Sequence, residues 1–173
     1  MRSLASLFIL LLTINLPALA SSSQNATLQV TLAKWNVAEY HKPYVAVWIE
    51  DARRKPSHVA LWYDIDKREH KGKEWLKDLR QWWRRGGRSL DLPYDGLTSA
   101  TKGPGSYSID SQLNSLLGTL KPGRYTLKVE ASREAGGREV VSIPFDLPLA
   151  ENVMPLKAKG ESELGAVVLD LKH

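Results

Sequence analysis

The alternation of apolar and polar residues predicts several β-strands along the chain. In residues 27–35 apolar side chains occupy every second position, as in a strand with one buried face. Segments 44–51 and 58–64 lie on either side of a charged turn and predict a hairpin. The further expected strands are 105–109, 124–132, 138–145 and 164–171.

In residues 72–85 the spacing of apolar side chains changes to that of a helix. Lysines and arginines recur on the opposite side, and Gly86-Gly87 predicts the end of the helix. We expect Trp75 and Trp82 to lie in the core and Trp83 at the edge of the apolar face. The residues of that face are Trp75, Leu76, Leu79, Trp82 and Trp83.

The order of the predicted elements favours an all-β fold. No helix repeatedly separates consecutive strands, which argues against a parallel, doubly wound sheet. Segment 111–120 fits either a helical turn or irregular backbone, and 147–159 is Pro-rich and extended. We therefore predict an immunoglobulin-like β-sandwich with one amphipathic helix inserted near 72–85. Residues 122–131 resemble the penultimate strand of the immunoglobulin-like module of flagellar hook-capping proteins.

The first twenty residues have the pattern of a secretory signal peptide. Arg2 precedes an apolar run at 7–16, and Ala18-Leu19-Ala20 is a small-x-small cleavage site, so we expect cleavage before Ser21. A membrane anchor is the alternative, but the run is too short to span a bilayer. We predict a periplasmic protein with a single domain over 21–173 and no transmembrane segment after cleavage.

The composition restricts the chemistry of the protein. The chain has no cysteine, which excludes Cys-ligated haem, iron–sulfur and zinc sites. Its four histidines are scattered without ligand spacing, so we predict no metal site. The Gly-x-Ser-x-Gly, His-Glu-x-x-His and Gly-x-Gly-x-x-Gly motifs are absent. We therefore assign no catalytic residue and do not expect an enzyme.

Positive charge is concentrated near the predicted helix. The formal net charge is +5, and residues 67–88 contain nine Lys/Arg against three Asp/Glu. Such a patch could attract FAD, hold a phosphate or contact an acidic partner. A solvated helix face explains it equally well. Export and the absence of other basic clusters argue against nucleic acid as a partner.

Residues 95–101, Asp-Gly-Leu-Thr-Ser-Ala-Thr, lie in a polar connection rich in Gly and Pro. Composition alone predicts a loop, with an Asx-turn at Asp95 as the structural interpretation. The order of residues resembles the acceptor motif of proteins that receive FMN covalently from a periplasmic flavin transferase. The resemblance implies that FMN is attached to Thr101 through a phosphoester.

The resemblance also implies roles for the neighbours of Thr101. Asp95 would orient the segment or assist the transferase's metal, and Thr98 and Ser99 would donate hydrogen bonds to the phosphate. Glycines would allow the backbone to enter another enzyme's active site. The tryptophan expected to contact the flavin is Trp83. The predicted cofactor-binding residues are Thr101, Asp95, Gly96, Thr98, Ser99, Ala100 and Trp83.

A longer likeness extends over roughly residues 28–145. The runs Pro-Tyr-Val-Ala-Val-Trp-Ile-Glu-Asp, Trp-Leu-x-x-Leu-Arg-x-Trp-Trp and Arg-Tyr-Thr-Leu-x-Val-Glu-Ala accompany the acceptor motif. Together they resemble an uncharacterised family of bacterial predicted periplasmic proteins, classed as a domain of unknown function. The motif itself is similar to that of the flavinylated subunits of sodium-pumping NADH:quinone oxidoreductase and of the Rnf complex. Those subunits have their own flavin-binding fold, which the pattern of this chain does not show.

Two functional hypotheses follow. In the first, the protein is a periplasmic electron-transfer flavoprotein carrying FMN on Thr101, and its partners are a flavin transferase and a membrane redox protein. The cofactor then carries the electrons, and the protein positions it. In the second, the chain is a cofactor-free module that binds a protein partner at the cell envelope.

Overall fold

The computed structural model of the protein describes residues 25–37, 39–150 and 154–172. The predicted signal peptide and its cleavage site before Ser21 lie outside these residues. The strands are β1 (Asn25–Leu32), β2 (Tyr44–Asp51), β3 (Pro56–Tyr63), β4 (Thr98–Ala100), β5 (Gly105–Ser108), β6 (Gly123–Ser132), β7 (Arg138–Leu147), β8 (Leu156–Lys159) and β9 (Leu164–Lys172). The helices are the 3₁₀ helices η1 (Arg68–Asp78) and η2 (Gly87–Ser89) and the α-helices α1 (Arg80–Arg84) and α2 (Asp110–Leu117).

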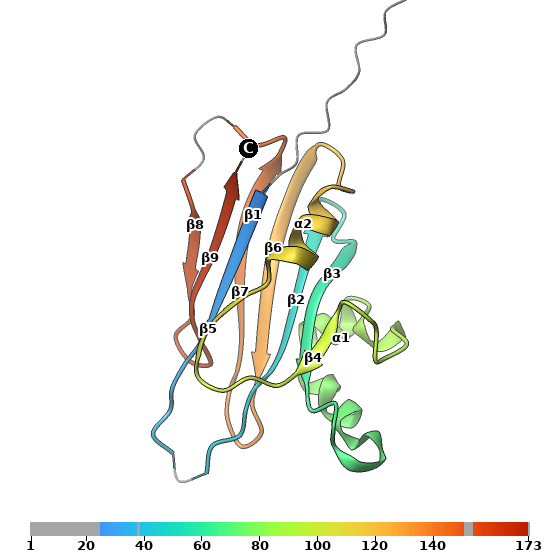
Figure 1. The fold of residues 1–173 in the computed structure, drawn as a ribbon, viewed down its shortest axis with the longest axis vertical. Helices are drawn as coiled ribbons and strands as arrows, with labels where there is room; N and C mark the ends of the chain where they lie inside the picture. The colour runs from blue at the N-terminus through green and yellow to red at the C-terminus, as the bar shows by residue number, and fades with distance from the viewer. Residues whose placement is uncertain (1–24, 38, 151–153, 173) are drawn as a thin grey trace, which may run out of the picture.

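Two sheets pack face to face (Figure 1). One has the strand order β5-β1-β9-β8, and the other has the order β4-β3-β2-β6-β7. Neighbouring strands pair antiparallel, except that β4 runs parallel to β3. The predicted all-β sandwich with a small helical part is confirmed.

The main hydrophobic core lies between the sheets. In β1 every second residue from Ala26 to Leu32 is buried, as the alternation in the sequence predicts. Inward-facing side chains of β2, β3, β6, β7 and β9 complete this core. Fully buried examples are Leu28, Val30, Val45, Val47, Ala131 and Val167.

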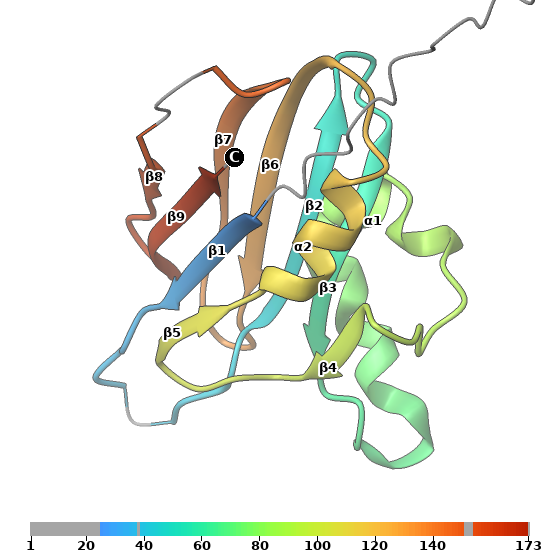
Figure 2. The ribbon, with the colours of Figure 1, turned by 45° about the horizontal axis from the view of Figure 1, so that its top comes forward.

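A second apolar cluster lies on the outer face of the larger sheet. Ala46 and Trp48 point away from the main core and are nevertheless fully buried, because the helical segment 68–84 covers them. Figures 1 and 2 show η1 and α1 beside β3, on the side away from β1 and β9. Burial on both faces explains why β2 is apolar at nearly every position. The other buried members are Leu61, Tyr63, Leu76, Leu79, Trp82, Leu92 and Leu97.

The helix predicted near 72–85 is present as two short helices. Leu79 lies between η1 and α1 with φ −74° and ψ 67°, outside the helical region, and its side chain is completely buried. The break changes the direction of the apolar face. Trp82 is buried as predicted, whereas Trp75 is 41% exposed, so the prediction that Trp75 belongs to the core is wrong.

Segment 111–120, which the sequence left undecided, begins with helix α2. The helix lies along the edge of β1, beyond the part of that strand that pairs with β5. The Asn114 side chain exchanges two hydrogen bonds of 2.7 Å with the backbone of Ala26, and Asp110 Oδ1 accepts one from the N–H of Leu28. These side chains satisfy backbone groups that would otherwise be unpaired at a strand edge.

Candidate functional site

Residues 95–101, which resemble an FMN acceptor motif, begin with a tight turn. The carbonyl oxygen of Tyr94 accepts hydrogen bonds from the N–H groups of Leu97 and Thr98 and from the Thr98 hydroxyl. Gly96 has φ +74°, a conformation that favours glycine. Leu97 is buried in the second apolar cluster. The first part of the motif therefore anchors the segment to the sheet.

The centre of the motif is a strand, although composition predicted a loop. In β4, Thr98 pairs with Leu61, Ser99 with Trp62 and Ala100 with Tyr63. Three small residues without apolar alternation carry no strand signal, so only the available edge of β3 explains this structure. Because β4 is the edge strand of its sheet, the motif lies where a second protein can reach it.

The register of the sheet determines where Thr101 lies. Tyr44 pairs with Ser132 of β6, while Val45 pairs with Trp62, so the start of β2 lies beside the ends of β3 and β6. The parallel pairing of β4 with β3 brings Ala100 to this same end. Thr101 follows directly, in the connection that crosses to the other sheet (Figure 2).

The segment after Thr101 is held as well. Lys102 Nζ lies 5.1 Å from the centroid of the Trp62 ring and 5.3 Å from that of Tyr107, distances typical of cation–π contacts. The Tyr107 hydroxyl donates a 2.9 Å hydrogen bond to the carbonyl of Gly103. Thr101 therefore lies on a supported backbone, with anchors before and after it, where the sequence suggested a freely flexible one.

Thr101 opens onto a cavity of about 360 Å³. Its walls come from the approach to β2, the end of β3, helix η1, the residue after β4 and the β6–β7 turn. The lining residues are Tyr40, His41, Lys42, Tyr44, Asp64, Lys67, Trp75, Asp78, Thr101, Ser132 and Glu134. Three are aromatic, and the others combine hydroxyls with charges of both signs.

The charged groups of the cavity partly compensate one another. His41 lies between two carboxylates, with Nε2 3.5 Å from Glu39 Oε1 and Nδ1 3.7 Å from Glu134 Oε2. Lys42 and Lys67 line the same space. A bound group would therefore meet hydrogen-bond donors and acceptors together.

The tyrosines of the cavity keep their protons at physiological pH. Burial raises the pKa of Tyr44 to about 12, and a hydrogen bond with the backbone of Asp64 opposes this effect. Burial also raises the pKa of Tyr40. Both hydroxyls are therefore neutral groups capable of donating hydrogen bonds.

The predicted neighbours of Thr101 do not all gather around it. Asp95 and Gly96 line a different, more apolar groove of about 650 Å³, formed with Tyr94 and residues of α2. Thr98, Ser99 and Ala100 do not line the cavity at Thr101, and the Thr98 hydroxyl is engaged by the Tyr94 carbonyl. Within the motif, Thr101 is therefore the residue that lines this cavity, while Asp95 and Gly96 line the other groove.

The tryptophan at the cavity is Trp75. Trp83 packs beside Trp82 at 6.4 Å between ring centroids, against the second apolar cluster, and does not line the cavity. Sequence reasoning missed Tyr40, Tyr44 and Trp75 as site residues because they come from separate segments. The hairpin of β2 and β3 was the available signal, since it brings Tyr44 close to Asp64.

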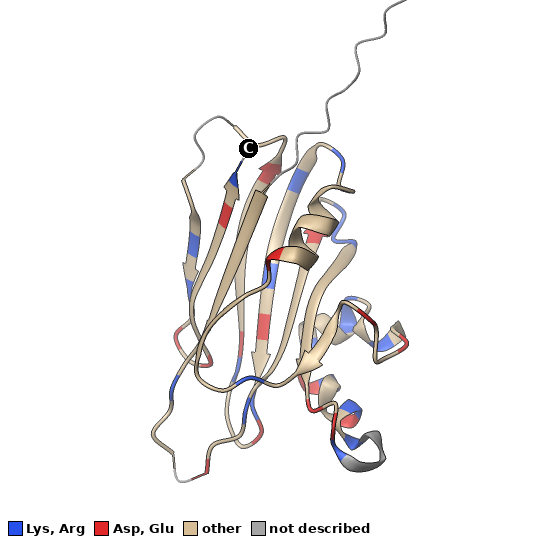
Figure 3. Ribbon diagram, in the orientation of Figure 1, with Lys and Arg blue, Asp and Glu red and all other residues tan. Residues whose placement is uncertain are grey.

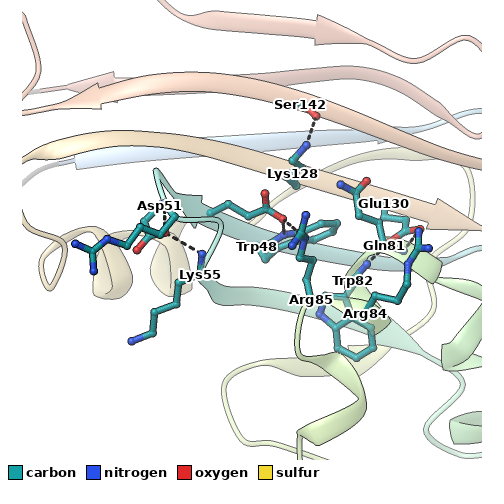
Figure 4. A network of polar contacts seen from close by, with 12 residues as sticks. Trp48, Asp51, Lys55, Gln81, Trp82, Arg84, Arg85, Lys128, Glu130 and Ser142 are labelled. Carbon is teal, nitrogen blue, oxygen red and sulfur yellow. Dashed lines mark hydrogen bonds and ion pairs between the residues drawn. The ribbon is translucent and has the colours of Figure 1, made fainter.

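Part of the positive charge of residues 67–88 has structural roles. Lys73 donates to the carbonyl of Leu92, and Arg85 lies 3.4 Å from the buried carboxylate of Glu50, which also accepts from Trp48 Nε1. Figure 4 shows Trp48 and Arg85 in this network, and Figure 3 shows acidic groups among the basic ones of the helical segment. The patch is therefore mixed rather than uniformly basic.

The described part of the chain contains neither a side-chain cluster suited to a metal ion nor a membrane-spanning helix. No group of three or more His, Cys, Asp or Glu is placed to hold a metal ion there. Likewise, none of the helices in the described ranges is long and apolar enough to cross a membrane.

Comparison with known proteins yields one family. The model described as "Predicted periplasmic protein (DUF2271)" matches residues 25–166, which include strands β1 to β8, segment 95–101 and the residues that line the cavity at Thr101. Neither a curated protein nor a solved structure matches the chain.

Proposed function

The chain belongs to the DUF2271 family of predicted periplasmic proteins, and we propose that it is a periplasmic electron carrier with FMN attached covalently to Thr101. The observation that carries this proposal is the position of Thr101. It ends the motif directly after the edge strand β4 and lines a cavity with three aromatic side chains. The FMN would supply the electron transfer, and the chain would hold and orient it.

The attachment reaction needs only a hydroxyl from this chain. Thr101 Oγ1 forms a bond to the FMN phosphorus of FAD, and the bond from that phosphorus to the bridging oxygen of the pyrophosphate breaks. AMP leaves with that oxygen, and the hydroxyl proton is released. The products are a phosphodiester-linked FMN and AMP, with no change of oxidation state. FAD and the catalytic groups come from a flavin transferase.

The structure around Thr101 suits such a substrate. The transferase must reach the hydroxyl, and an edge strand leaves one side of the segment open to a second protein. The anchors at Tyr94 and Lys102 hold the backbone on either side, so the hydroxyl is presented in a defined position. Pre-organisation of this kind lowers the entropy lost on binding.

The competing hypothesis is a cofactor-free module that binds a protein partner at the envelope. It accounts for the sandwich, but it leaves the acceptor motif without a role. The intact mass of the chain, co-produced with a flavin transferase in an exporting host, separates the two. We expect a gain of one FMN less one water.

Two hydroxyl variants control this experiment. Thr101→Val should remove the mass gain and the yellow colour. Thr98→Val should retain FMN, because the Thr98 hydroxyl is bonded to Tyr94 within the turn. An unmodified wild-type mass would overturn the proposal, and FMN retained by Thr101→Val would move the attachment to another residue.

A further inference from the structure

We infer that the cavity beside Thr101 is the binding site for the isoalloxazine ring of the attached FMN, with Trp75 as the aromatic wall. This inference rests on the proposed function and adds where the ring lies and which side chains hold it. The cavity has about 360 Å³, within the range of small-molecule sites.

The tether favours this cavity over the neighbouring groove. Thr101 lines the cavity itself, so a ring joined to its hydroxyl through the ribityl phosphate has direct access. The groove of about 650 Å³ is larger and more apolar, but it is lined by Asp95 and Gly96 and not by Thr101. Entry into the groove would require the ring to pass back along β4.

Trp75 has the exposure expected of a partner for a flat ring. It is 41% exposed, whereas Leu76, Leu79 and Trp82 of the same helical segment are buried. Its indole also borders a second hollow of about 390 Å³. Lys67 and Lys77 lie 5.9 and 6.0 Å from the ring centroid, at the outer limit of a cation–π contact, and they leave the indole partly open. Offset stacking on another aromatic ring would bury that surface.

The polar groups that line the cavity match the pyrimidine part of the isoalloxazine ring. The pyrimidine part of the ring has an N–H and two carbonyl groups, which require acceptors and donors. Asp64, Asp78 and Glu134 offer acceptors, while Tyr40 and Ser132 offer donors. Lys42 and Lys67 also line the cavity, where the three carboxylates offset their positive charge.

The test compares two tryptophans of similar exposure. Trp75 is 41% exposed at the cavity, and Trp35 is 37% exposed and does not line it. Each is changed to Ala in the chain carrying FMN, and intact mass first establishes one FMN per chain. Because stacked indole and phenol rings quench flavin emission, we expect a several-fold rise in emission for Trp75→Ala. Trp35→Ala should match wild type.

Two further variants serve as controls. One guards against misfolding of Trp75→Ala, and the other tests Trp83, the tryptophan that the sequence predicted at the flavin. Trp75→Leu keeps an apolar side chain at the position and should also raise emission and weaken the visible circular dichroism of the flavin. Trp83→Phe should change neither signal, because Trp83 does not line the cavity.

The outcomes distinguish this inference from the proposal it rests on. If FMN is present by mass and both Trp75 variants keep wild-type emission and dichroism, the ring lies elsewhere and the inference is overturned. The same conclusion follows if Trp83→Phe alone raises emission. Absence of FMN by mass would overturn the attachment and the ring site together.

Discussion

The Glu130 carboxylate accepts a hydrogen bond of 2.7 Å from the backbone N–H of Trp82, 48 residues earlier in the chain. It also accepts a bond of 3.0 Å from the N–H of Gln81 (Figure 4). Arg138 Nη1 donates a further bond of 2.6 Å to the same carboxylate. Glu130 is completely buried on β6. It therefore joins the first turn of α1 to the sheet, which positions the helical segment that contributes Trp75 to the cavity.

Removal of this carboxylate should loosen the helical segment. Glu130→Ala leaves two helix N–H groups and the Arg138 guanidinium without their partner, and we expect a loss of about 3 kcal/mol in the free energy of unfolding. Urea denaturation measures it. Asp146→Asn is the matched control, because the Asp146–Arg124 pair is exposed and should contribute less than about 1 kcal/mol. Equal effects for the two variants would contradict the role of Glu130.

His58 should make the protein sensitive to mild acid. Burial lowers the pKa of His58 below its usual 6.5, and Nδ1 accepts a 3.0 Å hydrogen bond from Trp82 Nε1, which requires an unprotonated nitrogen. A lowered pKa in the folded state means that the unfolded chain takes up the proton first. The stabilisation is therefore complete above pH 6.5 and is lost as the pH falls below 6.5 toward the folded-state pKa.

The contribution of His58 can be isolated with a non-titrating acceptor. In His58→Asn the amide oxygen can replace Nδ1 as the acceptor, so part of the acid sensitivity should disappear in urea denaturation between pH 7 and pH 5. An unchanged pH dependence in His58→Asn would show that other groups are responsible.

The tryptophans of the helical segment should differ sharply in their effect on stability. Trp82 is completely buried, so Trp82→Ala should cost about 4 kcal/mol through lost burial and the cavity that remains. Trp75 is 41% exposed, and Trp75→Ala should cost less than about 1 kcal/mol. Urea denaturation of both variants tests the assignment, and a large loss for Trp75→Ala would place its indole in the core instead.

The turn at the start of segment 95–101 should depend on Gly96. A side chain at φ +74° is strained even though a Cβ there would meet no atom within 4 Å, so Gly96→Ala should cost about 1 kcal/mol. Gly103→Ala is the control, because that site is equally open and its φ is not in the left-handed region. Thermal denaturation compares them. Equal stability of the two variants would remove the structural reason for this glycine.

The alternation of residues was sufficient to predict the sandwich. Period-two patterns such as that of β1 arise because one face of each strand is buried, and this local rule predicted the longer strands to within a few residues. The motif also led to the proposal that Thr101 carries FMN. The strand prediction and this proposal both depend on information contained within short stretches of the chain.

The surroundings of Thr101 required the tertiary structure. β4 exists because the edge of β3 is available to it, and the break at Leu79 accompanies the capping of α1 by Glu130. Strand register then brings Tyr44 and Thr101 to one end of the sheet, and η1 brings Trp75 there. These contacts join residues tens of positions apart, and no local pattern encodes which of them will meet. The local sequence thus led to Thr101 as the proposed attachment residue, while long-range packing decided the cavity around it.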